Sequence, residues 1–217
     1  MEDDMSTYHK IDSVYFRDPA TKHKTFIAGQ WSRDAFGYLA RNEWEWTEKV
    51  DGTNIRVTLN AGDLAFGGRT DNAQLPAPLV TRLMGLFPQG TAIRDYSGAP
   101  VYDAPVVLYG EGYGNKIQSG GKYKSDGVDF VLFDASVNGR FLSRNGVEII
   151  AGQLGVQFVP IVGRGTLLDA IQYVHEGFNS AWGDFVAEGL VCRPSVELCD
   201  SKGRRIITKI KHKDFLA

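Results

Sequence analysis

The strongest constraint on the fold is a run of alternating residues, Glu-Trp-Glu-Trp-Thr-Glu-Lys at positions 43–49. Alternation with a period of two is typical of a β-strand, whereas a helix repeats its apolar positions every three or four residues. The period places Trp46 and Glu48 on one face of this strand and Thr47 and Lys49 on the other. The chain is therefore expected to contain a sheet in which one strand ends on a lysine.

A turn and further strands follow this run. Asp51-Gly52-Thr53 has the composition of a turn, and residues 54–59 alternate again, as in a second strand. The remaining pattern predicts a hairpin turn at 60–63, helices at 79–87, 146–155 and 166–178, and strands ending near 66 and spanning 106–111, 128–134, 185–193 and 204–211.

The regions outside these elements are expected to be irregular. Residues 1–42 show no clear period and are predicted to form an irregular N-terminal lead, and residues 112–126 are predicted to form a long loop. No repeat or linker divides the chain. The predicted fold class is α+β, with largely antiparallel β-sheets and flanking helices in a single domain over residues 1–217.

Composition and charge narrow the class of protein. A hydrophobic content of 43% and a charged content of 23% are ordinary for a globular protein. The net charge of −2 provides no overall positive field, so polynucleotide binding would need a local basic patch, for which residues 202–213 are the strongest candidate. Cys192 and Cys199 lack partners at zinc-ligand spacing and are expected to be reduced thiols. The acidic N-terminus and the lack of a long apolar run favour a cytoplasmic protein without membrane contact.

The segment 48–54, Glu-Lys-Val-Asp-Gly-Thr-Asn, is the first candidate for chemistry. A strand would hold Lys49 rigidly, and Gly52 would let the backbone approach a ligand closely. A lysine amine attacks phosphorus once burial or neighbouring cations have lowered its pKa enough to release the proton. A surface lysine before a turn is the alternative interpretation of this segment alone.

Acidic and basic residues near the ends of later strands are further candidates. Glu111 lies between glycines at the end of an apolar strand, which suits a ribose hydroxyl or a metal, or simply a turn. Glu188 lies within an apolar pattern, where an unpaired charge is costly. Lys209 and Lys211 share one face of a predicted strand, and a phosphate between them would relieve their repulsion. A solvated edge strand is the alternative for this lysine pair.

The order of these motifs resembles the covalent nucleotidyltransferase superfamily of DNA ligases, RNA ligases and mRNA capping enzymes. The series runs Lys-x-Asp-Gly, arginine, Gly-Glu, aromatic, Glu-Gly-x-Val and Lys-x-Lys, and covers roughly residues 44 to 213. The RNA ligase 2 branch is the most similar, because its motifs Glu-Lys-x-x-Gly-Thr-Asn and Asp-Phe-x-x-Phe-Asp match residues 48–54 and 129–134. The resemblance implies a ligase-type adenylyltransferase domain.

The resemblance also implies roles for individual residues. Lys49 would attack the α-phosphorus of ATP and hold AMP, Lys209 and Lys211 would contact the α-phosphate, and Glu188 would engage the metal, Mg²⁺ or Mn²⁺. The remaining residues would bind the nucleotide: Glu48 beside adenine, Phe130 stacked on adenine, Glu111 on the ribose, Arg69 on the ribose or a 5′-phosphate end, and Asn54 near the phosphates.

The implied function is an ATP-dependent RNA ligase that joins 5′-phosphate and 3′-hydroxyl ends through lysyl-AMP and an adenylylated polynucleotide. Thr53-Asn54 and Asp129-Phe130 favour RNA over DNA ends, although Asp51 stands where this branch often has histidine. An ATP-dependent DNA ligase, a capping-type guanylyltransferase and a non-catalytic nucleotide- or RNA-binding module are the alternatives.

The sequence runs only six residues beyond Lys211, whereas most relatives continue into an OB-fold or a helical domain. No such C-terminal domain is expected, so a helper protein could supply substrate binding and unassisted sealing is expected to be slow.

Overall fold

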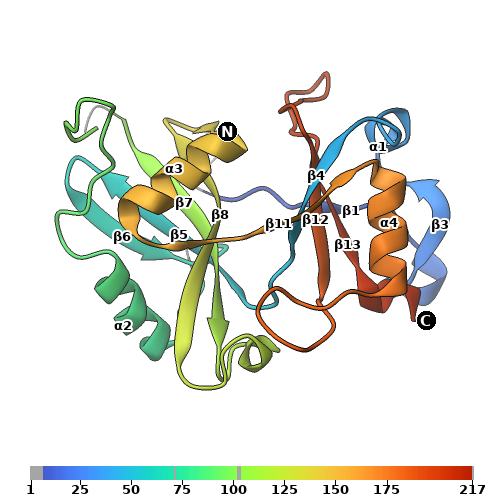
Figure 1. Ribbon diagram of the computed structural model, residues 1–217, viewed down its shortest axis with the longest axis horizontal. Helices are drawn as coiled ribbons and strands as arrows, with labels where there is room; N and C mark the ends of the chain where they lie inside the picture. Colours follow the sequence, from blue (N-terminus) through green and yellow to red (C-terminus); the bar gives the residue numbers. More distant parts are fainter. Residues whose placement is uncertain (1–6, 71, 102–103, 217) are drawn as a thin grey trace. The chain divides into compact units, whose positions relative to one another are not determined.

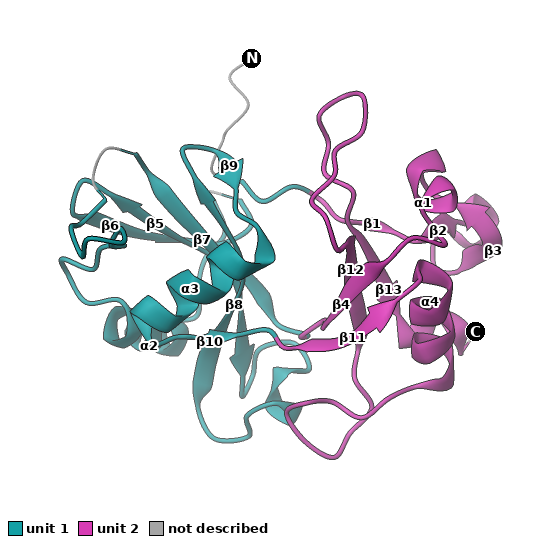
Figure 2. Ribbon diagram, turned by 45° about the horizontal axis from the view of Figure 1, so that its top comes forward, with its two compact units in different colours: residues 1–9, 51–159 teal, residues 10–50, 160–217 magenta. Residues whose placement is uncertain are grey.

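The computed structural model describes residues 7–70, 72–101 and 104–216. Its α+β architecture with mainly antiparallel sheets confirms the fold class expected from the sequence (Figure 1). The chain forms two compact units, where the sequence predicts one domain (Figure 2). Unit 1 contains residues 51–159 and the N-terminal residues up to His9, and unit 2 contains residues 10–50 and 160–217. No helix among the described residues combines the length and apolar character that a membrane span requires.

Unit 1 is built on a sheet with the strand order β10-β8-β7-β5-β6, in which β9 also pairs with β8. Neighbouring strands are antiparallel except for the parallel pair of β8 and β10. The strands are β5 (Thr53–Asn60), β6 (Asp63–Gly67), β7 (Val106–Gly114), β8 (Val128–Val137), β9 (Arg140–Phe141) and β10 (Gln157–Phe158). The helical segments are α2 (Ala77–Leu86), the 3-10 turn η2 (Gly120–Lys122) and α3 (Arg144–Leu154).

One face of this sheet forms the core of unit 1 with α2 and α3, both of which contact β8. Alternate residues of the strands, such as Val57 and Leu132, meet Leu79 and Leu83 of α2 and Val147 of α3. All five side chains are fully buried, so the apolar period of the sequence corresponds to this face.

Unit 2 is built on a sheet with the strand order β1-β13-β12-β4-β11. Only β1 and β13 are parallel in it. Its strands are β1 (Asp12–Ser13), β4 (Trp44–Glu48), β11 (Ile161–Gly165), β12 (Gly189–Pro194) and β13 (Thr208–Lys211), and a separate ribbon joins β2 (Tyr15–Arg17) to β3 (Phe26–Trp31). The helical segments are η1 (Pro19–Thr21), α1 (Asp34–Tyr38), α4 (Leu167–Glu176) and η3 (His212–Phe215).

Helix α4 covers one face of this sheet and contacts β12 and β13. The helix begins with a capping box, in which the side chains of Thr166 and Asp169 bond to each other's backbone N–H groups. Its apolar face packs with Trp44 and Trp46 of β4 in the core of unit 2. The period-two prediction for residues 43–49 is therefore confirmed, because both tryptophans lie on the buried face.

Two sequence predictions need correction. The expected irregular lead contains β1, β2, β3 and α1, whose strands are two to six residues long and too short to show a period. The last two predicted strands begin later than expected, at Gly189 and Thr208, so residues 185–188 and 204–207 lie outside them.

The side chain of Glu48 ties the end of β4 to the loop that precedes β12. Glu48 is 1% exposed, and its carboxylate accepts hydrogen bonds from Ser180 Oγ at 2.5 Å and from the Ala181 backbone N–H at 2.7 Å. Burial raises the pKa of this carboxyl group, and the two hydrogen bonds oppose that shift. Glu48 therefore fixes the chain that leads to Glu188.

Replacing Glu48 by alanine should destabilise the protein by about 2 kcal/mol, because it leaves two buried donors without an acceptor. Chemical denaturation measures this change. The matched control is Glu45→Ala in the same strand, which removes an ion pair with a largely exposed arginine (Glu45 Oε1 to Arg164 Nε, 3.0 Å). That control should cost less than about 1 kcal/mol. Equal losses for the two variants would contradict the proposed tie.

Candidate active site

Three neighbouring strands of unit 2 bring four of the predicted catalytic residues together. Lys49 directly follows β4, Glu188 directly precedes β12, and Lys209 and Lys211 lie on β13. Because β12 pairs with both β4 and β13, its first residue, Gly189, is in register with Lys211 and accepts a hydrogen bond from the backbone N–H of Lys49 at 2.9 Å. The backbone ladder thus sets the spacing of these side chains.

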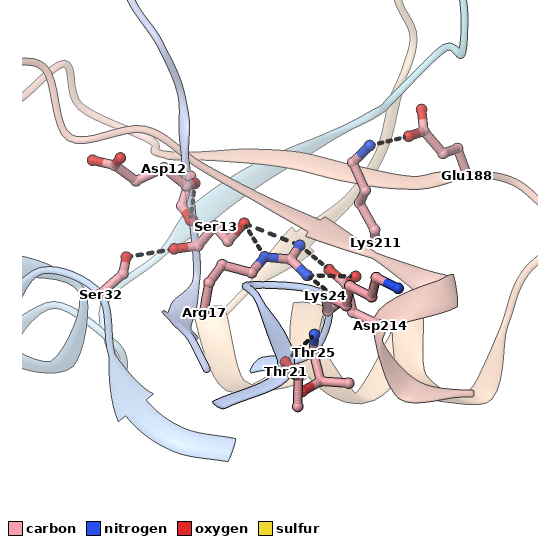
Figure 3. A network of polar contacts seen from close by, with 11 residues as sticks. Asp12, Ser13, Arg17, Thr21, Lys24, Thr25, Ser32, Glu188, Lys211 and Asp214 are labelled. Atoms are coloured by element: carbon pink, nitrogen blue, oxygen red, sulfur yellow. Dashed lines mark hydrogen bonds and ion pairs between the residues drawn. The ribbon is translucent and has the colours of Figure 1, made fainter. Parts of the chain in front are cut away.

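The carboxylate of Glu188 lies between two of the lysines. Its Oε2 atom is 2.7 Å from Lys49 Nζ, and its Oε1 atom is 2.6 Å from Lys211 Nζ, a contact visible in Figure 3. All three side chains are partly buried, so solvent weakens these ion pairs less than at an open surface. The structure therefore brings the predicted nucleophile next to Glu188, which the sequence places 139 residues away.

Lys209 is the cation that this carboxylate leaves uncompensated. Its side chain forms no ion pair within the described residues. Burial, followed by the charges of Lys211 and Lys49, lowers the pKa of Lys209 to about 8. Two lysines thus share one carboxylate with a third lysine nearby, and this excess of positive charge suits a phosphate group.

Glu188 also fits the predicted role in binding a divalent cation. The described residues contain no cluster of three or more histidine, cysteine or acidic side chains that could hold a metal by themselves. Mg²⁺ is commonly held by one or two carboxylates together with substrate phosphates and water, so one carboxylate beside a phosphate site is a sufficient protein contribution. A metal at Glu188 would compete with Lys49 and Lys211 for the same two oxygens.

Two predicted nucleotide-binding residues are neighbours in unit 1. Asn54 of β5 and Glu111 of β7 are partners in register, so their side chains lie on the same face of the sheet. The amide oxygen of Asn54 is buried and has no hydrogen-bond partner among the described residues. A buried amide without a partner requires an explanation, and a donor group of a bound ligand supplies one.

Glycine is required at the turn that follows the lysine. A Cβ atom on Gly52 would lie 2.2 Å from the carbonyl oxygen of Gly112 and 3.0 Å from Glu111 Cγ. The backbone of the turn therefore runs directly against the strand that carries Glu111. Tyr123, from the long loop predicted at residues 112–126, accepts a hydrogen bond from the Asp51 backbone N–H at 3.2 Å and fixes the other side of this turn.

Phe130 lies in the core of unit 1, and this placement argues against its predicted stacking on adenine. Its ring is 0% exposed and packs edge-on against Phe87, with 5.6 Å between the centroids. Glu111 is in register with Val131, so Val131 and not Phe130 occupies the face that carries Glu111, and Phe133 lies at a register shift between β7 and β8. The sequence motif contains two phenylalanines and does not show which of them is buried. The structure shows that Phe130 is buried and Phe133 is half-buried.

The other two residues predicted to contact the nucleotide are Glu48 and Arg69. Each carboxylate oxygen of Glu48 accepts one hydrogen bond from the loop before β12, and the role of Glu48 beside adenine stays a prediction. Arg69 is exposed just beyond the end of β6 (Asp63–Gly67), where the pairing with β5 has ended. The role of Arg69 stays a prediction.

The position of Lys209 makes the stability of the protein depend on pH. Its pKa is about 8 in the folded protein and 10.5 in a free side chain, so the unfolded chain binds more protons between these values. Stability should therefore rise as the pH rises through this interval. Lys209→Met removes the repelled charge and should stabilise the protein by about 1 kcal/mol near neutral pH, after a discount for solvent screening.

Chemical denaturation near neutral pH and again near the upper value measures this effect, and the gain should disappear at the higher pH. Lys211→Met is the control, because it breaks the ion pair with Glu188 and should destabilise the protein near neutral pH. A pH-independent gain in Lys209→Met would show that charge is not the cause.

Comparisons with known proteins identify the family. The sequence model of the RNA ligase family matches residues 42–211, and the comparison with curated proteins gave no match. The structure of Naegleria gruberi RNA ligase with pyrophosphate is similar, with a TM-score of 0.65 and 18% identity over 98% of this chain and 58% of that chain. A mutant of that ligase with ATP and Mn has a TM-score of 0.65 and 17% identity over the same shares of the two chains.

A further mutant without ligand has a TM-score of 0.66 and 17% identity, over 98% of this chain and 57% of that chain. At these identities the likeness shows the fold alone, and this chain spans somewhat more than half the length of the Naegleria chains. The family match, in contrast, covers most of the sequence and includes Lys49, Glu188 and the lysine pair. This protein belongs to the RNA ligase family.

Proposed function

We propose that this protein is an ATP-dependent RNA ligase that joins 5′-phosphate and 3′-hydroxyl ends through a lysyl-AMP intermediate. The observation that carries the proposal is the contact of the Glu188 carboxylate with Lys49 on one side and Lys211 on the other, beside the uncompensated Lys209. Membership of the RNA ligase family supports the same reaction class.

In the first step the neutral amine of Lys49 attacks the α-phosphorus of ATP. An N–P bond forms, the bond to the bridging oxygen breaks, and pyrophosphate leaves with its electron pair. The attacking nitrogen releases one proton to solvent or to the leaving pyrophosphate, and AMP stays on Lys49. Lys209 and Lys211 neutralise the negative charge that builds up on the phosphate oxygens, which is the main demand of phosphoryl and nucleotidyl transfer.

The protonation state of Lys49 decides when this step can occur. The Glu188 carboxylate at 2.7 Å stabilises its ammonium form, whereas the nearby charges of Lys209 and Lys211 disfavour it. A cation that draws Glu188 away from Lys49 therefore favours the nucleophilic amine. A Mg²⁺ or Mn²⁺ ion held by Glu188 and the phosphates would supply positive charge there.

The later steps return the enzyme to its starting state. An oxygen of the 5′-phosphate attacks the phosphorus of lysyl-AMP, so AMP passes to the RNA end and Lys49 is released. A 3′-hydroxyl then attacks the activated 5′-phosphate, a phosphodiester bond forms, and AMP leaves. Glu111 and Asn54 are proposed to hold the ribose and phosphates of the nucleotide, because their register brings them together beside the turn at Gly52.

Incubation with α-labelled ATP and magnesium should place label on the wild-type protein that survives denaturation and mild alkali and is released by acid, as expected of an N–P bond. Lys49→Ala should lose that label completely, because no amine remains to form the bond. Denaturing gel electrophoresis without acid treatment measures it. Lys122→Ala, an exposed lysine of unit 1, is the matched control and should label normally. Label that persists in Lys49→Ala would refute the assigned nucleophile, and an unlabelled wild type would favour a binding module. Labelling by GTP in place of ATP would identify a guanylyltransferase.

The nature of the 3′-hydroxyl strand tests the preference for RNA. Two nicked duplexes that differ only in a ribose or a deoxyribose at the 3′-hydroxyl end are compared. The ribose substrate should be sealed about tenfold faster or more. The reason is that a site which binds the 2′-hydroxyl has unpaired polar groups when DNA is bound. Denaturing gels measure the sealed product over time. Equal rates, or faster sealing of DNA, would instead identify a DNA ligase.

A further inference from the structure

Unit 2 contains a large cavity that begins at the lysine pair of β13 and extends along β1, β2 and the segment around residue 200. Its volume is about 1410 Å³, and nine lysine and arginine side chains line it against four aspartates. We name this cavity the basic groove. Five of its lysines form no ion pair within the described part of the chain: Lys10, Lys24, Lys202, Lys209 and Lys213.

The arginines of the basic groove are already held by the aspartates. Arg17 donates to both oxygens of Asp214, at 2.8 and 2.5 Å, and to Ser13 Oγ, at 3.2 Å (Figure 3). Arg33 and Arg204 both bind Asp200, at 2.9 and 2.8 Å. These contacts neutralise the negative charges of Asp200 and Asp214, so the lysines carry the excess positive charge of the groove. The wall of the groove is therefore rigid, and its free charge is positive.

An aromatic side chain stands among these cations. Phe16, on β2 next to Arg17, lines the groove and is 54% exposed. A groove that alternates cations with an accessible aromatic ring fits single-stranded nucleic acid, because phosphates contact the cations and a base stacks on the ring. In a duplex, the bases are already stacked on one another and do not need such a ring.

The size and the charge of the groove both exceed what a mononucleotide needs. Small-molecule pockets have volumes of roughly 300–1,000 Å³, so a cavity of about 1410 Å³ has room for more than one nucleotide. The whole chain has a net charge of −2, yet five lysines without an ion pair among the described residues line this one cavity. Burial and then the charges of Lys211, Lys49, Lys10 and Arg17 lower the pKa of Lys209, and an anion in the groove would relieve this repulsion.

We propose that the basic groove binds a single-stranded RNA segment adjoining the end to be joined, with its phosphates on Lys24, Lys202 and Lys213 and a base stacked on Phe16. The proposal rests on the proposed ligase function and adds to it the chemistry that holds the polynucleotide. The groove reaches Lys209 and Lys211, so RNA bound in it leads to the lysines assigned to the α-phosphate.

Fluorescence anisotropy with a 5′-phosphorylated single-stranded RNA of about ten nucleotides tests the groove in the full chain, at a length within the range of single-strand sites. The triple variant K24Q/K202Q/K213Q should weaken binding about tenfold and lower the slope of log affinity against log salt by about 2, since each lost phosphate contact removes about 0.7. Phe16→Ala should weaken binding about fivefold or more through lost stacking.

Two matched controls keep the test specific. Lys22→Gln replaces an exposed lysine two residues from Lys24 that does not line the groove, and Tyr38→Ala removes an exposed ring of unit 2 outside it. Both should bind RNA like the wild type. Equal losses in Lys22→Gln and Lys24→Gln, or a triple variant with unchanged affinity and salt slope, would overturn the groove. Tighter binding of duplex RNA that is insensitive to Phe16→Ala would also overturn it.

Labelling with α-labelled ATP in the absence of RNA separates the two proposals. The groove variants should label like the wild type, because none of the replaced residues is assigned to adenylylation. Loss of RNA binding with intact labelling supports the groove. Absence of label in the wild type refutes the ligase function by itself, and the RNA affinities still decide whether the groove binds RNA.

Discussion

The site depends on the carboxylate of Glu188, which holds the nucleophile candidate Lys49 and Lys211 in contact with the same group. Without an anion at this point, Lys49 after β4 and the two lysines of β13 would repel one another across β12 in a partly buried position. A phosphate group can take over this neutralising role, so the same arrangement that stabilises the protein without nucleotide is prepared for a nucleotide. The arrangement needs no movement of the backbone, because the pairing of β4, β12 and β13 fixes the spacing.

Much of this arrangement could be predicted from the sequence. The strand pattern at 43–49 and the order of the charged motifs can be recognised without knowing how the strands pair. Register itself is a long-range property, and the sequence does not show where it places individual side chains. Phe130 and Phe133 are equivalent in the motif, but pairing with β7 puts Phe130 in the core. Glu48 looks like a ligand contact next to Lys49, yet a loop distant in sequence occupies its carboxylate. The run 202–213 was a candidate basic patch, but Lys10 and Lys24 join it only because β1 pairs with β13.

Several motif residues have roles in folding that explain their chemical type. Asp134 accepts a hydrogen bond from the Tyr8 hydroxyl at 2.9 Å inside unit 1 and does not need a ligand to be satisfied. Gly189 has a φ of +151°, and a Cβ atom there would lie 2.0 Å from the carbonyl oxygen of Ile210. The glycine after Glu188 is thus required for β12 and β13 to approach, which is what brings Glu188 within reach of Lys211.

The central position of β12 has a consequence for how such an enzyme can diversify. All the charged groups assigned to bond making belong to one sheet, whereas Asn54 and Glu111, assigned to the nucleotide, belong to the other unit. On the proposed assignment, substitutions of Asn54 or Glu111 would change how the ribose and phosphates are held, while Lys49 would keep its electrostatic surroundings. Recognition of the nucleotide and reactivity of the lysine would then be encoded in separate parts of the chain, so the first could vary without loss of the second.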